Sequence, residues 1–350
     1  MSQLNVVVLF GGCSPEHEVS LQSAAAVLRN LDRERFCPLP VGISRKGDWF
    51  LFSGSEAAIE DGSWLSLPEC APCALLPDRS ARALLVRGAQ GARLLPVDAV
   101  FPVLHGANGE DGTVQGLIEL AGIPLAGCGT LASALCMDKH RAHLLASLAG
   151  VAVPRGAVVG PDAPRAEALR LARALGYPLF VKPVRAGSSF GITRVAQEAD
   201  LPRALETALQ YDREAILEEA VPGFEVGCAV VGRGADLLLG EVDEVELASG
   251  FFDYEEKYTL RTSALHVPAR LSPADAARVK SAAAAVYRAL GCAGFARVDL
   301  FFTPEGRIVF NEVNTIPGFT EHSRFPGMLR AAGCGFSQIL TRILEEAMRA

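Results

Sequence analysis

The sequence lacks any apolar run that reaches the length of about 20 residues at which a helix crosses a membrane. Its N-terminal stretch, Met1 to Phe10, has neither the charged segment nor the cleavage site of a secretory signal, so we expect a cytoplasmic protein with no membrane partner. Positive charge is also scarce, because 33 Lys and Arg stand against 40 Asp and Glu, a net charge of −7. With no basic stripe to neutralise a phosphate backbone, a nucleic-acid-binding protein is excluded.

Cysteine pairing is another missing feature. The nine cysteines are an odd number scattered along the chain, which is typical of reduced thiols and not of a disulfide framework. Cys70 and Cys73 form a single CxxC pair in a Pro-rich stretch, where a structural role is favoured over a redox or zinc site. The chain also lacks internal repeats and low-complexity tracts. Its 350 residues, 50% of them hydrophobic, can build the cores of two or three domains.

The first part of the chain has the pattern of an α/β layer. The apolar run from Leu4 to Phe10 predicts a strand that enters the turn Gly11-Gly12. Ser14 is a good N-cap and Pro15 a good first helical residue, so we predict a helix from there to about residue 30. Strands near 39–43 and 99–104, a hairpin-bearing excursion over 48–96 and a helix at 113–121 complete a first domain at residues 1–125.

Two further domains follow in our interpretation. Residues 126–222 alternate predicted strands (153–159, 178–183, 192–195, 215–219) with predicted helices (138–149, 166–175, 201–211). Residues 223–350 predict a broad sheet, with strands at 226–231 and 237–246, followed by a helix at 273–290, a hairpin and a closing helix at 336–348. An irregular polar segment at 248–263 interrupts this third domain. The fold class predicted is therefore α/β, with α+β character in places.

The strongest chemical signal is the hairpin at residues 296–314. Its two apolar runs flank Thr303-Pro304-Glu305-Gly306, a pattern typical of a type I turn. Pairing the runs about this turn makes Asp299 and Glu312 diagonal neighbours and puts five residues on one face: Arg297, Asp299, Phe310, Glu312 and Asn314. Buried carboxylates need a cation, and two carboxylates with an amide oxygen suit Mg²⁺, especially when nucleotide phosphates complete its shell. The alternative is that Arg297 neutralises one carboxylate and solvent wets the other.

A second signal concerns phosphate. The small residues of loop 184–191 can expose N–H groups and serine hydroxyls, although an ordinary hairpin turn is an alternative reading. Lys182 ends an apolar strand just before this loop, where a bound phosphate is a natural partner. Lys139 offers a second cation at a helix start, with a solvated surface lysine as the alternative.

Several other polar groups lie at strand ends. In the segment 216–225, Glu218 or Glu225 could accept a ribose hydroxyl, although a plain acidic connection is the simpler reading. Glu16 lies near a helix start, where the dipole alone explains a carboxylate, yet it also follows a strand end of the kind that binds ligands in open α/β sheets. The segment beginning at His105 has too many glycines for a packing element. We expect His140 and His143 to be surface residues and not metal ligands.

In their order along the chain, these residues resemble the ATP-grasp ligases and, within them, the D-alanine–D-alanine ligases. The resemblance is carried by segments 11–20, 105–116, 137–139, 181–183, 187–191, 254–258, 311–318 and 322–323. It implies an ATP-grasp fold, in which an N-terminal open α/β domain precedes two domains that sandwich ATP. It also implies a cytoplasmic homodimer that makes peptidoglycan precursors for the cell wall.

The resemblance implies a role for each matched residue. Lys139, Lys182, Ser188 and Ser189 would hold the ATP phosphates, and Glu218, Glu219, Val221 and Glu225 would line the adenosine site. Asp299, Glu312 and Asn314 would bind two Mg²⁺ ions, with Mn²⁺ as a substitute. Arg297 and the Gly318 N–H would face the oxyanion. Glu16, with Ser188 and Tyr258, would take the ammonium of the first D-alanine, with His105 nearby; Lys257, Ser323 and Arg324 would meet the second substrate, and the 248–263 segment would form a lid.

The implied reaction converts the carboxylate of D-alanine into an acylphosphate, which the amine of a second D-amino acid then attacks. The second substrate stays open between D-alanine and D-serine. Tyr258 follows the dipeptide-forming pattern, whereas Gly11-Gly12-Cys13, the 251–254 segment, Phe319 and Arg324 look like the D-alanine–D-serine ligases of glycopeptide (vancomycin) resistance. Two competing hypotheses are another ATP-grasp carboxylate–amine ligase and a regulatory nucleotide-binding protein on an inactive ligase scaffold.

Overall fold

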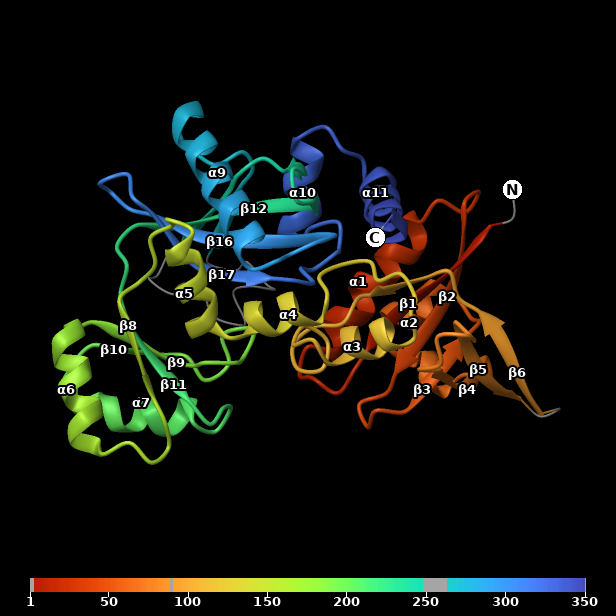
Figure 1. The fold of residues 1–350 in the computed structure, drawn as a ribbon, viewed down its shortest axis with the longest axis horizontal. Coiled ribbons are helices and arrows are strands. Elements are labelled where there is room, and N and C mark those ends of the chain that lie inside the picture. The colour runs from red at the N-terminus through yellow and green to blue at the C-terminus, as the bar shows by residue number, and fades with distance from the viewer. Residues whose placement is uncertain (1–2, 89–90, 248–262, 350) are drawn as a thin grey trace.

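The computed structural model describes residues 3–88, 91–247 and 263–349 and confirms an α/β architecture (Figure 1). Three sheets form it, built from residues 4–102, 156–219 and 224–314 respectively. Each sheet lies within one of the ranges expected as a domain, and the domain boundaries themselves stay a prediction. No helix in the described ranges has the length and apolar character needed to span a membrane.

The first sheet has seven strands in the order β6-β5-β4-β3-β2-β1-β7. Strand β1 runs parallel to both β2 and β7, and the excursion predicted at 48–96 forms an antiparallel extension from β3 to β6. Its elements are β1 (Leu4–Gly11), α1 (His17–Asn30), β2 (Phe36–Ile43), β3 (Trp49–Phe52), α2 (Glu56–Glu60), the 3-10 turn η1 (Ser63–Ser66), β4 (Cys70–Leu75), β5 (Ala83–Gly88), β6 (Gly91–Pro96), β7 (Ala99–Pro102) and α3 (Thr113–Leu120).

The turn between β1 and α1 differs from its prediction. Helix α1 begins at His17 and not at Pro15, and Ser14 does not cap it. The Ser14 hydroxyl instead donates to the His105 carbonyl at 2.7 Å and accepts from the Glu16 N–H at 3.2 Å. Gly11 has φ +86°, and a Cβ there would lie 2.3 Å from the Ile43 carbonyl oxygen, so only glycine fits. This turn holds Glu16 buried at the carboxyl end of β1.

The second sheet has four antiparallel strands in the order β10-β9-β11-β8. Asp138 is the N-cap of the preceding helix α5, because its side chain accepts from the Arg141 N–H at 2.9 Å. The elements of this part are α4 (Thr130–Met137), α5 (Lys139–Leu148), β8 (Gly156–Val159), α6 (Arg165–Leu175), β9 (Leu179–Pro183), β10 (Thr193–Val195), the 3-10 turn η2 (Glu198–Asp200), α7 (Leu201–Ala208) and β11 (Ala215–Glu219).

The third sheet follows the order β15-β14-β12-β16-β17, with β13 paired to β12. Helices α4, α5 and α9 pack on it through a common apolar core. Its elements are β12 (Phe224–Arg233), β13 (Asp236–Leu239), β14 (Asp243–Leu247), β15 (Ser263–His266), α9 (Pro273–Ala289), β16 (Phe295–Phe302), β17 (Ile308–Asn314), α10 (Arg324–Ala331) and α11 (Phe336–Arg349).

The β16–β17 hairpin contains the predicted turn and a bulge. The Gly306 N–H donates to the Thr303 carbonyl at 2.8 Å, and Gly306 has φ +75°. Beyond the turn, Leu300 pairs with Phe310 but Asp299 pairs with Glu312, so one residue of β17 is left over. The prediction that Phe310 shares the carboxylate face is therefore wrong, since the bulge turns Phe310 into the core. Asp299 and Glu312 lie directly opposite each other and not diagonally.

All nine cysteines are free thiols. Burial raises the pKa of Cys73 to about 11, which keeps this thiol protonated. The Cys70 thiol donates to the Trp64 carbonyl at 3.2 Å. The burial of Cys73 and the hydrogen bond of Cys70 both favour a structural role for the CxxC pair.

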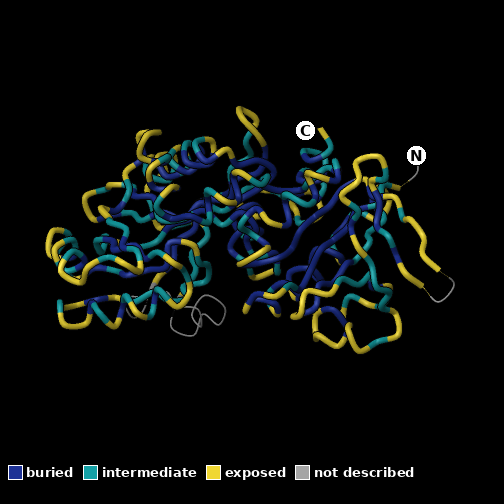
Figure 2. The backbone as a smooth tube through the Cα atoms, turned by 60° about the horizontal axis from the view of Figure 1, so that its bottom comes forward, coloured by how far each residue is buried: buried dark blue, intermediate teal, exposed yellow. Residues whose placement is uncertain are grey.

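An aromatic cluster joins the first sheet to the C-terminal part of the chain. Phe101 of β7 stacks on Phe295 of β16 with ring centroids 5.6 Å apart, and Phe319 packs edge-on against Phe295 at 5.2 Å. Phe325 of α10 lies 5.2 Å from Phe319, and all four rings are fully buried. Figure 2 shows the buried backbone in the centre of the molecule, with exposed turns around its edge. The first and third sheets therefore share one core.

Replacing Phe295 with alanine should lower the free energy of unfolding by about 3–5 kcal/mol, because a cavity would open in this shared core. Chemical denaturation followed by circular dichroism measures the change. Leu148→Ala is the matched control, since Leu148 is 85% exposed and its loss should change stability by less than about 0.5 kcal/mol. Equal effects of the two substitutions would contradict this account of the core.

Candidate active site

A cleft of about 630 Å³ lies between the second and third sheets. Strands β9 and β11 line one side, and strands β12, β14 and β17 line the other. The cleft brings together eight residues that the sequence predicts as site residues: Lys139, Lys182, Ser189, Glu218, Glu219, Val221, Glu225 and Glu312. Most of the predicted nucleotide-binding residues thus converge on one cavity.

The two lysines that line this cleft are buried. The Lys182 ammonium lies 2.5 Å from Glu218 Oε2, and the Lys139 ammonium donates to the Ala186 carbonyl at 2.5 Å. Burial alone would raise the pKa of Glu218, but the Lys182 charge lowers it below the ordinary value. The reading of Lys139 as a solvated surface residue is therefore wrong.

The acidic residues of segment 216–225, which runs from β11 into β12, lie in different environments. Glu218 is buried, whereas Glu219 is held by Arg155, whose Nε lies 2.5 Å from its carboxylate. Glu225 accepts from Arg324 at 2.6 Å. Val221 lines the cleft between them. These contacts hold the segment in place along the cleft, so it is more than a plain acidic connection.

Loop 184–191 leaves β9 and crosses to the first domain. Ser188 and Ser189 both have positive φ, +48° and +60°, a backbone conformation that residues other than glycine rarely adopt. The Ser188 hydroxyl donates to a carboxylate oxygen of Glu16, which joins the loop to the β1–α1 turn. The two predicted partners of the first substrate are thus brought together.

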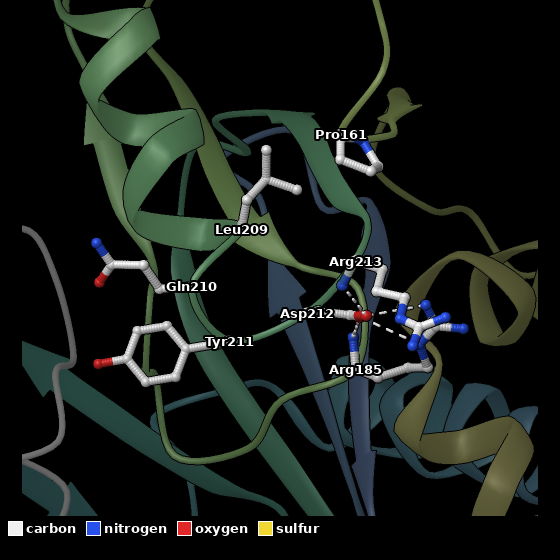
Figure 3. A pocket seen from close by; sticks show the side chains of 7 residues that line it. All are labelled: Pro161, Arg185, Leu209, Gln210, Tyr211, Asp212 and Arg213. Atoms are coloured by element: carbon white, nitrogen blue, oxygen red, sulfur yellow. Dashed lines mark hydrogen bonds and ion pairs between the residues drawn. The ribbon is translucent and has the colours of Figure 1, made fainter.

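The base of this loop is anchored on a surface hollow (Figure 3). The Arg185 N–H donates to Asp212 at 2.7 Å, and its guanidinium bonds both Asp212 and Glu214. Dashed lines in Figure 3 converge on the Asp212 carboxylate, which also accepts from the Arg213 N–H at 2.6 Å. Phe190, near the other end of the loop, stacks on Tyr211 at 6.1 Å. The turn between α7 and β11 therefore fixes both ends of the loop, a role that no sequence motif indicated.

A second group of polar side chains surrounds Glu16. His105 is buried, and its Nδ1 lies 2.9 Å from the Ile316 carbonyl. Its Nε2 is buried with no hydrogen-bond partner in the described part of the chain. Burial lowers the pKa of His105 below its ordinary value. The neutral imidazole therefore lies beside Glu16 with one nitrogen left for a ligand.

Glu110 completes this group and was missed by sequence reasoning. It accepts from the Gly106 N–H at 2.9 Å and from the Ile316 N–H at 3.2 Å. Burial, and secondly the charge of Glu16, raise the pKa of Glu110 to about 8. The only signal for it was its place in the glycine-rich segment that starts at His105.

Asp299 lies at the centre of a charge network. Its carboxylate is 1% exposed and accepts from Arg297 at 2.7 and 2.8 Å and from the Asn314 amide nitrogen at 2.8 Å. This pairing with Arg297 is the alternative that the sequence left open. Asp299 Oδ1 accepts one of these bonds, so it retains a lone pair, and Asn314 can offer a cation its amide oxygen. Within the described residues, no three His, Cys, Asp or Glu side chains form a metal-binding group.

Arg324 is the second arginine of this network. Buried in α10, it binds Asp243 at 2.7 and 2.9 Å and lies 3.5 Å from Asp299 Oδ1. Ser323 precedes α10, and its hydroxyl accepts from the Thr320 N–H at 3.0 Å. A Cβ on Gly318 would lie 2.9 Å from this hydroxyl, so the two residues are in close contact. The predicted Lys257, Tyr258 and the lid at 248–263 lie outside the described residues, apart from Ser263 in β15.

The expectation for His143 is wrong, because this residue is 5% exposed. It lies in α5 between Glu218 and the Asn311 carbonyl. The signal that could have found it is its position four residues after Lys139, one helical turn along the same face.

Comparison with known proteins identifies close relatives. A family model described as "D-ala D-ala ligase N-terminus" matches residues 5–128, and one described as "D-ala D-ala ligase C-terminus" matches residues 147–345. A putative D-alanine–D-lactate ligase of Streptomyces coelicolor is 45% identical over 352 residues, 99% of each chain. The D-alanine–D-alanine ligase of Caldicellulosiruptor bescii is 40% identical over 99% of this chain and 96% of its own.

A solved structure agrees with these matches. The crystal structure of the VanG D-Ala:D-Ser ligase from Enterococcus faecalis superposes with a TM-score of 0.92 at 50% identity, covering 99% of this chain and 100% of that one. The names of these three relatives differ in the second partner, which is D-lactate, D-alanine or D-serine.

The raised pKa of Glu110 predicts how stability depends on pH. The folded protein keeps the Glu110 proton up to a pKa of about 8, whereas the unfolded chain loses it near the ordinary value of about 4.5. Its contribution to stability is therefore full below pH of about 4.5 and falls as pH rises to about 8.

Replacing Glu110 with glutamine should remove this slope, because glutamine cannot ionise. Urea unfolding of wild type and E110Q from pH 5 to pH 9 measures the difference, which should change by up to about 1.4 kcal/mol per pH unit below pH 8. The exposed Glu34→Gln is the matched control and should parallel wild type. Parallel curves for E110Q and wild type would show that Glu110 titrates normally.

Proposed function

This chain belongs to the D-alanine–D-alanine ligase family, and we propose that it is the ATP-dependent ligase that joins D-alanine to a second D-amino acid for peptidoglycan synthesis. The ATP-grasp arrangement predicted from the sequence is that of this family. One observation carries the proposal. The cleft that holds Lys139, Lys182 and Glu218 opens beside the loop whose Ser188 donates to Glu16, so a nucleotide site adjoins an ammonium site.

The cleft has the groups that a nucleotide requires. Lys139 and Lys182 would bind the phosphates, with the hydroxyls of Ser188 and Ser189 as further donors. Glu218, Glu219, Val221 and Glu225 would line the adenosine site. ATP would supply the phosphoryl group that turns the donor carboxylate into an acylphosphate, a far better electrophile.

The oxygen atoms of the β16–β17 hairpin fit Mg²⁺, with Mn²⁺ as a substitute. Glu312 lines the cleft, Asp299 Oδ1 retains a lone pair, and Asn314 can offer its amide oxygen, so three hard oxygen ligands are available. We infer that Asp299, Glu312 and Asn314 would hold two ions, which neutralise phosphate charge. The count of two rests on the family resemblance.

The remaining residues act on the amino acids. Glu16 would bind the ammonium of the first D-alanine, and Ser188 and Tyr258 would hold the Glu16 carboxylate in place. His105 lies close to Glu16. Arg297 and the Gly318 N–H would stabilise the oxyanion that forms when the second amine attacks. Lys257 and Ser323 would bind the carboxylate of the second substrate.

D-Serine is a second candidate acceptor. The observation that favours it is Arg324, which is buried in a frame of Asp243 and Glu225 next to the predicted acceptor site. VanG, which shares 50% of its residues with this chain, is described as a D-Ala:D-Ser ligase. D-Alanine remains the first candidate because both family models carry that name.

We also infer a cytoplasmic homodimer. The homodimer rests on the family resemblance and is supported by two exposed leucines on neighbouring helices, Leu120 of α3 at 64% and Leu131 of α4 at 73% exposure.

Phosphate release from ATP with Mg²⁺ and D-alanine tests the function, with the products identified by mass spectrometry. D-Alanine alone should stimulate release and yield the D,D-dipeptide, and EDTA should abolish it. D-Serine and D-lactate, each added to D-alanine, distinguish the acceptors by product mass. The double variant D299A/E312A should lose activity. If no D-amino acid stimulates release above background, the ligase proposal fails.

Replacing Arg297 with alanine should lower kcat by about 10²–10³-fold, since it removes one oxyanion donor and leaves Asp299 with less charge compensation. Steady-state kinetics measure this. The exposed Arg288 of α9 is the matched control, and R288A should keep wild-type kcat. An unchanged kcat in R297A would remove Arg297 from the reaction.

A further inference from the structure

His143 is held by contacts on both ring nitrogens. Its Nε2 lies 2.8 Å from the Asn311 carbonyl oxygen, and its ring packs edge-on against Phe310 with centroids 5.5 Å apart. A carbonyl oxygen can only accept a hydrogen bond, so Nε2 carries a proton. In a neutral imidazole the other nitrogen, Nδ1, then presents a lone pair.

That lone pair faces a carboxylate. His143 Nδ1 lies 3.5 Å from Glu218 Oε1, an oxygen that is buried and has no hydrogen-bond partner in the described part of the chain. The other oxygen of Glu218 is bound by Lys182 at 2.5 Å. Because Oε1 has no solvent contact, it points to the interior and not into the cleft. Two acceptors therefore face each other unless a proton enters between them.

Bound nucleotide would change this balance. Lys182 lines the cleft as one of its two lysines, so a phosphate would share the ammonium that now neutralises Glu218. Glu218, which is 1% exposed, would then need a second cation. The nearest group that can become one is His143.

The charged groups around His143 are known. Burial lowers the pKa of His143 below its ordinary value; the charge of Glu218 from β11 raises it, and Lys182 from β9 and Lys139 from its own helix lower it. Strand β17 supplies the Asn311 carbonyl and the Phe310 ring. In the free protein the ring is therefore neutral at neutral pH. Phosphate charge on the two lysines would offset the groups that lower its proton affinity.

We propose that His143 is a positioning residue of the nucleotide cleft, which takes up a proton from solvent when nucleotide binds and then holds Glu218 in place of Lys182. This inference rests on the proposed function, because it requires a nucleotide in this cleft. The nitrogen that gains the proton is Nδ1, and the bond that forms is Nδ1–H to Glu218 Oε1.

Isothermal titration calorimetry of the whole protein tests the proposal. A non-hydrolysable ATP analogue with Mg²⁺ is titrated at pH 6 to 8 in two buffers of different ionisation enthalpy, which gives the number of protons taken up. Wild type should take up as much as about one proton per nucleotide more than H143Q, and its affinity should weaken by up to about tenfold per pH unit as pH rises. Ionisation of the ligand itself is common to both proteins and cancels.

Two further variants sharpen the test. H143R has a guanidinium that stays charged even when buried, so it should bind nucleotide at pH 8 at least as tightly as wild type, with no linked proton. It also serves if H143Q does not fold. H140Q, on the same helix and half-buried, is the matched control and should behave as wild type.

The outcomes separate the two proposals. Proton uptake that is the same in wild type, H143Q and H143R overturns the role of His143 while leaving the ligase intact. Failure of the wild type to bind nucleotide overturns the proposed function, and this inference with it.

Discussion

The site depends on one extra residue in an antiparallel ladder. Because Asp299 pairs with Glu312 while Leu300 pairs with Phe310, the bulge in β17 puts the two carboxylates directly opposite each other, at the separation of about 4.5–5.5 Å between Cα atoms that cross-strand neighbours have. If the ladder continued regularly from the Leu300–Phe310 pair, Asp299 would lie opposite Asn311 and Glu312 opposite Val298. The same bulge keeps Phe310 in the core, so the chemistry of one face is gained without loss of packing on the other.

The burial of charged side chains is the second constraint, and it is met by pairing buried carboxylates with cationic side chains. Asp299 is satisfied by Arg297 and Asn314, Asp243 by Arg324, and Glu218 by Lys182. Such networks cost desolvation energy that apolar residues would not. Arg324 of α10 and Asp243 of β14, like Lys182 of β9 and Glu218 of β11, come from elements far apart in sequence, so these two pairs also fix the relative position of those elements. Rigid placement of charge is what a site that handles a triphosphate requires.

Much of this could be predicted from the sequence. The periodicity of the apolar runs located most helices and strands, and the turn at Thr303 to Gly306 fixed the hairpin. Lys182 and Glu218 could be predicted as cleft residues because they lie at the ends of apolar strands, and Lys139 because it lies at a helix start. The predictions that were wrong or missing concern tertiary structure. They are the direction of Phe310, which the bulge turns into the core, the interior position of His143, and the burial that shifts the pKa of Glu110 to about 8. None of these has a local pattern, because each arises where segments distant in the chain meet.

The distribution of aromatic side chains has a practical consequence. Both tryptophans, Trp49 and Trp64, belong to the first sheet and its turns, and Trp64 is buried against Phe10 at 5.0 Å. Intrinsic indole fluorescence therefore reports directly on the N-terminal third of the molecule and is silent on the nucleotide cleft. A nucleotide in the cleft that altered this emission would act at a distance, through the shared phenylalanine core or through the Ser188–Glu16 contact. The two indoles are therefore native probes of communication between the cleft and the first sheet.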